Sequence, residues 1–327
     1  MISVVDERRA TLANWLQEKT SFNGGSLSLA SADASFRRYF RLLQAEESFI
    51  VMDAPPSLED SLPFVEIGEW MKGNGLNVPT IFARDLELGF MVLSDFGDYH
   101  FQDALQKENN DTLYTLATEE IYKLQKYLPE SQKMLPTFTP SWQSKELEIF
   151  REWCTPEISP SEYQEITDIL VREVDKIPKA FMHRDFHCRN LLLCPDKNIG
   201  IIDFQGAMYG PITYDLVSLL RDCYVNNDPV WVNQQVTNFQ QSILSAGLLY
   251  ADVEPEQFIR WFDLAGLQRH LKCVGIFHRL QIRDRKPEYM KDVPRVLGYI
   301  KQVLDFYPEL KEIKKIVNEA SILKEIS

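Results

Sequence analysis

Hydrophobic positions recur at two different spacings in the first hundred residues, and each spacing predicts a different kind of element. A helical spacing places apolar side chains at Val5, Leu12, Trp15 and Leu16. Short apolar or aromatic runs predict four strands, at residues 35–43, 48–54, 80–85 and 89–95. Residues 63–75, which end in glycines, predict a second helix. The pattern predicts a small sheet carrying a helix over residues 1–98.

The pattern changes after residue 98. Three helices are predicted, at residues 111–128, 142–153 and 159–176. Strand-like runs return at residues 179–185, 190–194 and 199–204, and nearly everything from residue 213 onward has helical spacing. The chain is therefore predicted to be an α+β protein of two lobes, 1–98 and 99–327, which join near residues 93–100.

Composition narrows the class of protein. The 327 residues are 45% hydrophobic and 25% charged, as in a globular protein, and the net charge of −13 argues against a nucleic-acid partner. The five cysteines form no Cys-x-x-Cys motif, so neither a disulfide framework nor a zinc site is expected. The first residues do not resemble a signal peptide, and no apolar run reaches about 18 residues. A cytoplasmic protein with no membrane partner is the expectation.

The strongest chemical signal is "HRDFHCRNLLL" at residues 183–193, followed by "IIDFQG" at residues 201–206. Asp185 can accept a proton from a substrate hydroxyl, and the amide oxygen of Asn190 can bind a metal ion. Asp203, at the end of the next hairpin strand, can complete a site for Mg²⁺, which favours a few protein oxygens with phosphate and water. The alternative, a polar turn between buried strands, explains this spacing less well.

His183, Asp185, His187 and Asn190 together resemble the His-x-Asp-x-His-x-x-Asn motif of the aminoglycoside phosphotransferase and choline kinase superfamily. The resemblance extends from about residue 31 to about residue 299. It implies a two-lobed protein-kinase-like fold and the use of ATP and Mg²⁺. It also implies that Asp185 is the catalytic base and that Asn190 and Asp203 are the metal ligands. Asp215 matches an aspartate that caps a helix and braces the catalytic loop in that superfamily.

Five segments in one order resemble a narrower group, the bacterial anomeric amino-sugar kinases of cell-wall recycling. They are "SADASFRRYFR", "VMDAPP", "HRDFHCRNL", "DFQGAMYGPITYDLVSLLRDCY" and "GLQRHLKCVGIFHRL". This resemblance implies that the acceptor is the C1 hydroxyl of N-acetylmuramate or N-acetylglucosamine. Two rival functions stay open: an aminoglycoside or other small-alcohol kinase, and a nucleotide-binding regulatory protein without activity.

Three neighbours of Asp185 have more than one interpretation. His183 and His187 are expected to hydrogen-bond the loop backbone, and the alternative is a direct part in the chemistry. Arg189 is a candidate catalytic residue that neutralises phosphate charge, and pairing with an acidic neighbour is equally compatible with the sequence.

A literal Asp-Phe-Gly occurs at Asp95-Phe96-Gly97, some ninety residues before the His-Arg-Asp segment. The metal-binding Asp-Phe-Gly of protein kinases follows that segment. The tripeptide is therefore interpreted as a coincidence. The resemblance places it at the hinge, where backbone groups from Leu93 to Asp95 would hold the adenine edge.

The sequence lacks two phosphate-binding features of kinases. The strand position that holds a lysine in protein kinases is Met52 here, and "SADASFRRYF" stands in place of the glycine-rich loop. Arg37, Arg38 and Arg41 are the candidates for the missing cation. In a strand, Arg37 and Arg41 point to one face and Arg38 to the other. The alternative is that these arginines lie at a solvated edge.

A basic segment in the second lobe suggests an anionic acceptor. Residues 266–301 hold nine Lys/Arg and three Asp/Glu, a net charge of 9 − 3 = +6 in an acidic chain. Within it, one helical stripe about 80° wide contains Arg269, Lys272, Ile276, Arg279 and Arg283. Its members Arg269, Lys272 and Arg279 are the candidate substrate-binding residues. The lactyl carboxylate of N-acetylmuramate would suit such a stripe. A solvated basic surface is the alternative.

Overall fold

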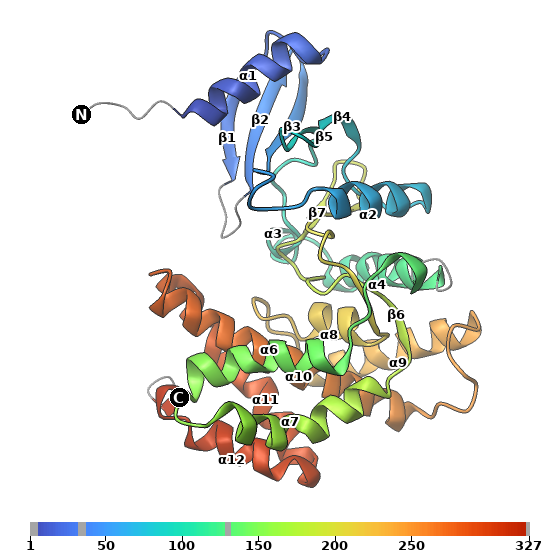
Figure 1. Ribbon diagram of the computed structural model, residues 1–327. Coiled ribbons are helices and arrows are strands. Elements are labelled where there is room, and N and C mark those ends of the chain that lie inside the picture. Colours follow the sequence, from blue (N-terminus) through green and yellow to red (C-terminus); the bar gives the residue numbers. More distant parts are fainter. Residues whose placement is uncertain (1–5, 32–36, 128–131, 325–327) are drawn as a thin grey trace. The chain divides into compact units, whose positions relative to one another are not determined.

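The computed structural model describes residues 6–31, 37–127 and 132–324, which divide into two compact units (Figure 1). The first unit runs up to Tyr99 and includes Leu192–Gln205, and the second contains His100–Leu191 and continues from Gly206. The predicted division at residues 98/99 stays a prediction, and these compact units differ from it mainly in Leu192–Gln205.

The first unit is built on a five-stranded antiparallel sheet with the strand order β1-β2-β3-β5-β4. Its strands are β1 (Ser26–Ser31), β2 (Arg38–Gln44), β3 (Glu47–Asp53), β4 (Ile81–Asp85) and β5 (Phe90–Ser94). Its helices are α1 (Glu7–Lys19) and α2 (Leu62–Gly73). A separate two-stranded sheet joins β7 (Leu191–Leu193) and β8 (Ile199–Ile201). The predicted small antiparallel sheet with a helix is confirmed.

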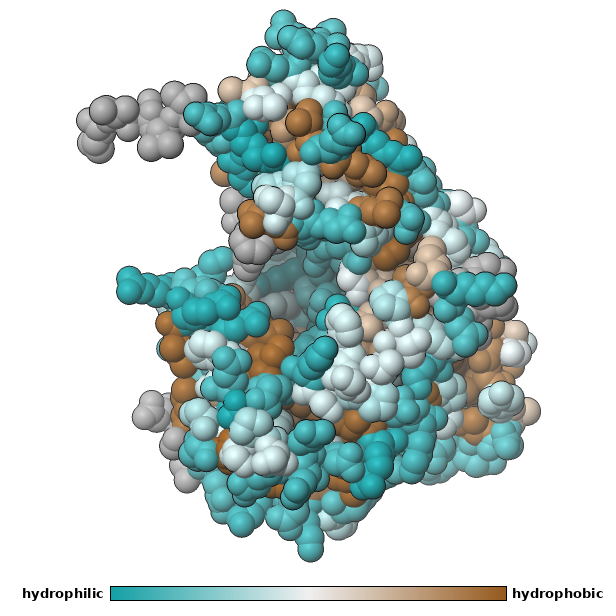
Figure 2. All heavy atoms as spheres, viewed as in Figure 1, coloured by the Kyte–Doolittle hydropathy of each residue, from teal (hydrophilic) through white to brown (hydrophobic). Residues whose placement is uncertain are grey.

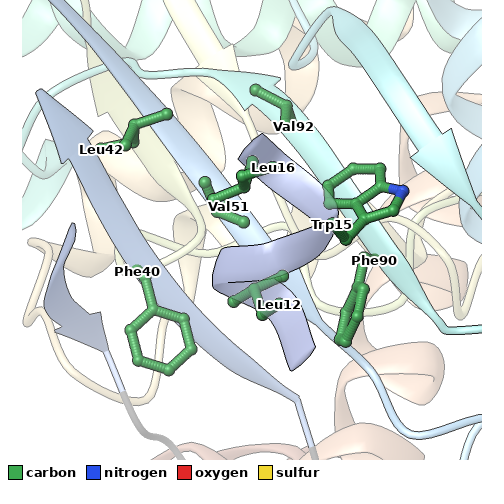
Figure 3. Close-up of a cluster of buried hydrophobic side chains, with 8 residues drawn as sticks. All are labelled: Leu12, Trp15, Leu16, Phe40, Leu42, Val51, Phe90 and Val92. Atoms are coloured by element: carbon green, nitrogen blue, oxygen red, sulfur yellow. The ribbon is translucent and has the colours of Figure 1, made fainter. Parts of the chain in front are cut away.

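Helix α1 covers one face of this sheet because its apolar residues fall on one side. Leu12, Trp15 and Leu16 are its buried residues. They pack against side chains of β2, β3 and β5, as Figure 3 shows for Phe40, Leu42, Val51, Phe90 and Val92. Burial of each large apolar side chain contributes about 1.5–3 kcal/mol, which makes this cluster the core of the sheet.

A buried acid at the end of the central strand fastens α1 to the sheet. Asp53, at the end of β3, is fully buried, and its carboxylate accepts a hydrogen bond from Arg8 Nε of α1 at 2.6 Å. Arg38 Nη2 of β2 donates to the other carboxylate oxygen at 2.6 Å. Two cations therefore compensate one buried charge, as a buried carboxylate requires.

The second unit is mainly helical. Its helices are α3 (Phe101–Ala104), α4 (Asn110–Lys126), α6 (Pro140–Cys154), α7 (Pro160–Asp175), α8 (Tyr214–Leu220), α9 (Pro229–Ser245), α10 (Pro255–Ile282), α11 (Val293–Phe306), α12 (Lys311–Glu319) and α13 (Ser321–Lys324), with the 3₁₀ turns η1 (Pro287–Asp292) and η2 (Pro308–Leu310). Strands β6 (Lys179–Met182) and β9 (Met208–Pro211) form a two-stranded antiparallel sheet. Helix α10 packs against α6, α7, α8, α9 and α11, so its middle is surrounded by protein.

Three of these helices begin in the same way. A side-chain oxygen caps the first turn and a proline follows it, in the pairs Thr139-Pro140, Ser159-Pro160 and Asp228-Pro229. The cap satisfies a backbone N–H that has no partner within the helix, and the proline has no N–H to satisfy. Local chemistry therefore fixes where α6, α7 and α9 start.

The structure adds two strands to the prediction and shortens another. β1 was missed because Leu27 and Leu29 alternate with small polar residues at a sheet edge, and the four-residue β9 was also missed. The strand predicted at 179–185 ends at Met182, because Arg184 adopts a left-handed φ of 78° that a strand cannot contain.

Hydrophilic side chains cover much of the face seen in Figure 2, with hydrophobic side chains in smaller groups. Among the helices of the described residues, none combines the length and apolar character needed to cross a membrane.

Candidate active site

The loop that carries the motif connects β6 to β7 and is held by Asp215. The backbone N–H groups of His183 and Arg184 donate to the two oxygens of the buried Asp215 carboxylate, at 2.7 and 3.0 Å. These bonds stabilise the left-handed backbone of Arg184. The predicted bracing role of Asp215 is confirmed, whereas the capping role was wrong, because the N-cap residue of α8 is Thr213.

Asp185 lies in this loop, and its main chain is held by other groups of the loop. Its backbone oxygen accepts hydrogen bonds from His187 N and from Asn190 Nδ2, both at 3.0 Å. Its side chain is partly exposed and makes no hydrogen bond or ion pair with the residues that the structure describes. The loop backbone is thus internally bonded, while the side chain of Asp185 has no hydrogen-bond partner among the described residues.

Charges from helix α10 and from the loop itself keep Asp185 ionised. Burial alone would raise the pKa of this carboxyl, but the nearby cations Lys272 and Arg269 of α10, with Arg184 and the ring of His187, lower it below its ordinary value. An ionised carboxylate beside a reacting hydroxyl is the protonation state that a proton acceptor requires.

A buried acid, Glu146 of α6, organises the cations behind Asp185. It accepts a hydrogen bond from Arg184 Nη2, lies 3.5 Å from Lys272 Nζ and accepts a bond from Gln268 Nε2 at 3.2 Å. Lys272 Nζ also donates to the hydroxyl of Tyr214 at 3.1 Å. Burial would raise the pKa of Glu146, but Lys272 and Arg184 lower it, so the acid and both cations stay charged.

The basic stripe predicted on α10 is buried at its start and exposed at its end. Arg269 is only 1% exposed, and its Nη1 donates to the sulfur of Cys223 at 3.4 Å. Arg279 is partly exposed, and no hydrogen bond or ion pair joins it to Asp185 in the described residues. Arg283 is exposed and pairs with Asp284. The alternative of a solvated surface therefore fits Arg283 and does not fit Arg269 or Lys272.

Arg189 lies against aromatic rings. The centre of its guanidinium is 3.6 Å from the ring centroid of Tyr224 and 5.7 Å from that of Tyr289. The acidic partner that the sequence left open is not found among the residues described. His187 Nδ1 accepts a bond from the backbone N–H of Arg189 at 3.4 Å, so the prediction that His187 bonds the loop backbone is confirmed.

The two predicted metal ligands flank the β7–β8 pair in the sequence, one before β7 and the other after β8. Asn190 directly precedes β7, and because its Nδ2 donates to Asp185, its Oδ1 is the side-chain atom suited to a cation. Asp203 comes two residues after β8 with a left-handed φ of 64°, and its Oδ1 accepts a bond from Gln205 at 2.7 Å. An amide oxygen and a carboxylate are ligand types that Mg²⁺ accepts.

All three candidate arginines of the first unit pair with acids, and Arg38 and Arg41 pair with two each. Arg38 bonds Asp53 and Asp6. Arg41 bonds Asp95 at 2.6 Å and Asp98 at 2.7 Å. These ion pairs give both arginines a role in the sheet, so neither matches the alternative of a merely solvated edge.

Arg37 differs from the other two arginines in its surroundings. It is 2% exposed and pairs with Glu59 at 2.8 Å. Burial raises the pKa of Tyr39, and the charges of Arg37 and Asp203 both act on that tyrosine, which places the two groups in the same neighbourhood. Residues 32–36 of the segment that replaces the glycine-rich loop lie outside the described residues.

Met52 and Leu93, where the predicted hinge begins, both lie on strands of the sheet. Met52 is fully buried in β3, paired with Tyr39 and Met91, so no cation occupies this strand position. Leu93 is buried in β5, and Asp95 follows the end of that strand. The carboxylate of Asp95 accepts bonds from Arg41, from Ser48 and from the backbone N–H of Gly97. Those protein partners support a structural role for the literal Asp-Phe-Gly.

The chain matches the phosphotransferase enzyme family over residues 26–249. The chain belongs to this family. It is 37% identical to an N-acetylmuramate/N-acetylglucosamine kinase of Pseudomonas putida, over 96% of this chain and 97% of the relative. It is 38% identical to the kinase of the same name from Pseudomonas aeruginosa, over 88% of this chain and 86% of the relative.

An ethanolamine kinase of Plasmodium vivax shares the fold, with a TM-score of 0.62 at 12% identity over 91% of this chain and 87% of that chain. The resemblance to this kinase superfamily and the predicted two-lobed, kinase-like fold are confirmed. Family membership likewise confirms the predicted enzyme class, an ATP-dependent phosphotransferase.

Sequence reasoning missed Glu146, Tyr224 and Tyr289. A signal for Glu146 was present, since it falls at the helical spacing of Leu147 and Phe150, the buried residues of α6. A charged residue on an apolar stripe indicates a buried ion pair. The two tyrosines carried no such signal, because only the folded chain brings them to Arg189.

Proposed function

We propose that this protein transfers the γ-phosphoryl group of ATP to the C1 hydroxyl of N-acetylmuramate or N-acetylglucosamine. The observation that carries the proposal is the ionised carboxylate of the partly exposed Asp185 on the motif loop. The choice of acceptor is supported by the relatives, which carry the name of that activity over nearly the whole chain.

Asp185 would accept the proton of the sugar hydroxyl as its oxygen bonds to the γ-phosphorus. The bond between that phosphorus and the bridging oxygen of ADP breaks, and ADP leaves with the electron pair. The protein's contribution is chiefly position and charge. Lys272, Arg269 and Arg184 serve this step indirectly, by keeping Asp185 ionised.

Asn190 and Asp203 would hold Mg²⁺, and their oxygen donors suit that ion. When bound, the ion would neutralise charge on the phosphates. Arg37 is the candidate for the cation missing at Met52, because its charge and that of the proposed metal ligand Asp203 both act on Tyr39. Backbone groups of Leu93–Asp95 are the proposed contacts of the adenine edge.

The test is ADP release from ATP and Mg²⁺ with a panel of acceptors, followed by phosphorus NMR of any product. The panel contains N-acetylmuramate, N-acetylglucosamine, N-acetylgalactosamine, kanamycin and choline. A C1-phosphate of an N-acetyl amino sugar supports the proposal. Turnover of kanamycin or choline alone would contradict the proposed acceptor and indicate an aminoglycoside or other small-alcohol kinase. Nucleotide binding without turnover of any acceptor would favour a regulatory protein, with the uncharged Met52 as its explanation.

A further inference from the structure

Arg189 is a cation of the catalytic loop with no acidic partner among the described residues, in a chain of net charge −13. The acid nearest in sequence to Tyr224, the aromatic partner of Arg189, is Asp222. That carboxylate is occupied by the backbone N–H groups of Cys188 at 2.8 Å and Tyr224 at 2.7 Å. A loop arginine that its own protein leaves unpaired is suited to an anion from outside.

The rings beside Arg189 fix where its hydrogen-bond donors can point. At 3.6 Å from the Tyr224 centroid, the guanidinium is in van der Waals contact with the ring face, where the cation is attracted. A guanidinium stacked on a ring carries its N–H donors around the edge of the stack, in the fork that matches a carboxylate. The aromatic contact thus immobilises the group without using its donors.

The surroundings of Arg189 favour a sugar carboxylate over a phosphate. Tyr224, Phe277 and Tyr289 form a continuous aromatic cluster, with ring centroids 6.1 Å and 5.7 Å apart in succession. Phosphate sites are lined by backbone N–H groups and cations. A sugar ring has apolar faces that suit aromatic side chains, and an acidic sugar also brings a charged group for the arginine.

We infer that Arg189, stacked on Tyr224, binds the carboxylate of an acidic sugar acceptor and thereby sets the preference between acidic and neutral amino sugars. The inference rests on the proposed function. N-acetylmuramate and N-acetylglucosamine suit the test because they share the reacting C1 hydroxyl and differ in the lactyl carboxylate. Arg189 lies four residues from Asp185 on the same loop, and the charges of both residues act on the ring of His187 between them.

The experiment compares Arg189→Met and Arg189→Lys with Arg172→Met, which changes an exposed arginine of α7 that pairs only with Asp168. The measured quantity is the ratio of kcat/KM for N-acetylmuramate to kcat/KM for N-acetylglucosamine at saturating ATP. Arg189→Met should lower this ratio by about 10- to 100-fold, chiefly through the KM for N-acetylmuramate, as expected for loss of a charge-assisted pair. The ratio for Arg189→Lys should lie between that of the wild type and that of Arg189→Met.

An equal loss of kcat for both acceptors would overturn the inference and assign Arg189 to the phosphate instead. An unchanged ratio in Arg189→Met would also overturn it. The uncharged methyl ester of N-acetylmuramate provides a test on the wild-type enzyme alone. Its KM should rise well above that of the acid, and an equal KM would contradict the inference even if the variants failed to fold. A wild-type enzyme that phosphorylates neither sugar would refute the proposed function itself.

Discussion

The carboxylate of Asp215 accepts a hydrogen bond from the backbone N–H of His183 at 2.7 Å, and so fastens the start of the loop that carries Asp185 to the first turn of α8. A second bond, from the N–H of Arg184, holds that residue at its left-handed φ of 78°. The next residue is Asp185, so its position depends on this anchor.

Asp215→Asn should weaken both the fold and the activity, because an amide group has only one oxygen to accept two backbone N–H groups. We expect the free energy of unfolding in urea to fall by about 1–3 kcal/mol. We expect kcat to fall by about 10- to 100-fold, because a misplaced base is costly. Asp168→Asn, at an exposed ion pair of α7, is the control and should change neither quantity appreciably. Wild-type kcat in Asp215→Asn would contradict the bracing role.

Glu146→Gln should be among the most destabilising single changes in the second unit. It leaves the half-buried Arg184 and the buried Lys272 beside a neutral amide, and breaking a buried ion pair costs about 3 kcal/mol or more. Glu148→Gln is a matched control, since Glu148 lies on the same helix in a more exposed pair with Arg151. Urea denaturation compares them, and Lys272→Met added to Glu146→Gln should restore part of the loss. Equal stability of the two single variants would refute the proposed importance of Glu146.

The lowered pKa of Asp185 predicts that the stability of the protein depends on pH. Its pKa is lowered in the folded protein, so its ionised form adds stability above its ordinary pKa, and that contribution disappears as the pH falls below about 4. Asp185→Asn should therefore be less stable than the wild type at pH 7 and pH 5, by about 1 kcal/mol, and the difference should shrink at pH 3.5. Urea denaturation at the three pH values measures this. A difference that grows on acidification would have the wrong sign.

Asp203→Asn and Asp95→Asn distinguish the proposed metal ligand from the literal Asp-Phe-Gly. The first removes a charged oxygen from the proposed site, so the Mg²⁺ concentration for half-maximal activity should rise by about tenfold or more. The second weakens an ion pair with Arg41 and should lower thermal stability with the same Mg²⁺ requirement as the wild type. Activity titrated with Mg²⁺ decides between them, and a shifted requirement in Asp95→Asn alone would reverse the assignment.

The sequence predicted well what local chemistry determines. The spacing of Asp185, Asn190 and Asp203 identified the loop, and helical periodicity located α1, with its buried Leu12 and Trp15. It could not show that Arg38 and Arg41 bond different acids, since Asp53 and Asp95 approach them only when the strands pair.

The charges that surround Asp185 could not be predicted from local sequence patterns either. Glu146 and Lys272 lie on α6 and α10, far from the loop in sequence, and meet only through helix packing. The stripe on α10 suggested exposed charge because periodicity gives the face of a helix and says nothing of what covers it. Burial of Arg269 follows from the elements that surround α10.

The central claim is that Asp185 accepts the proton of the acceptor hydroxyl, and one comparison tests it most directly. The kcat of Asp185→Asn should be measured beside the wild type on the phosphorylated amino sugar, with ATP binding measured by calorimetry. The account predicts a loss of about 10²- to 10⁴-fold in kcat with ATP affinity retained. A kcat within a few-fold of the wild type would contradict the account and remove Asp185 from its role.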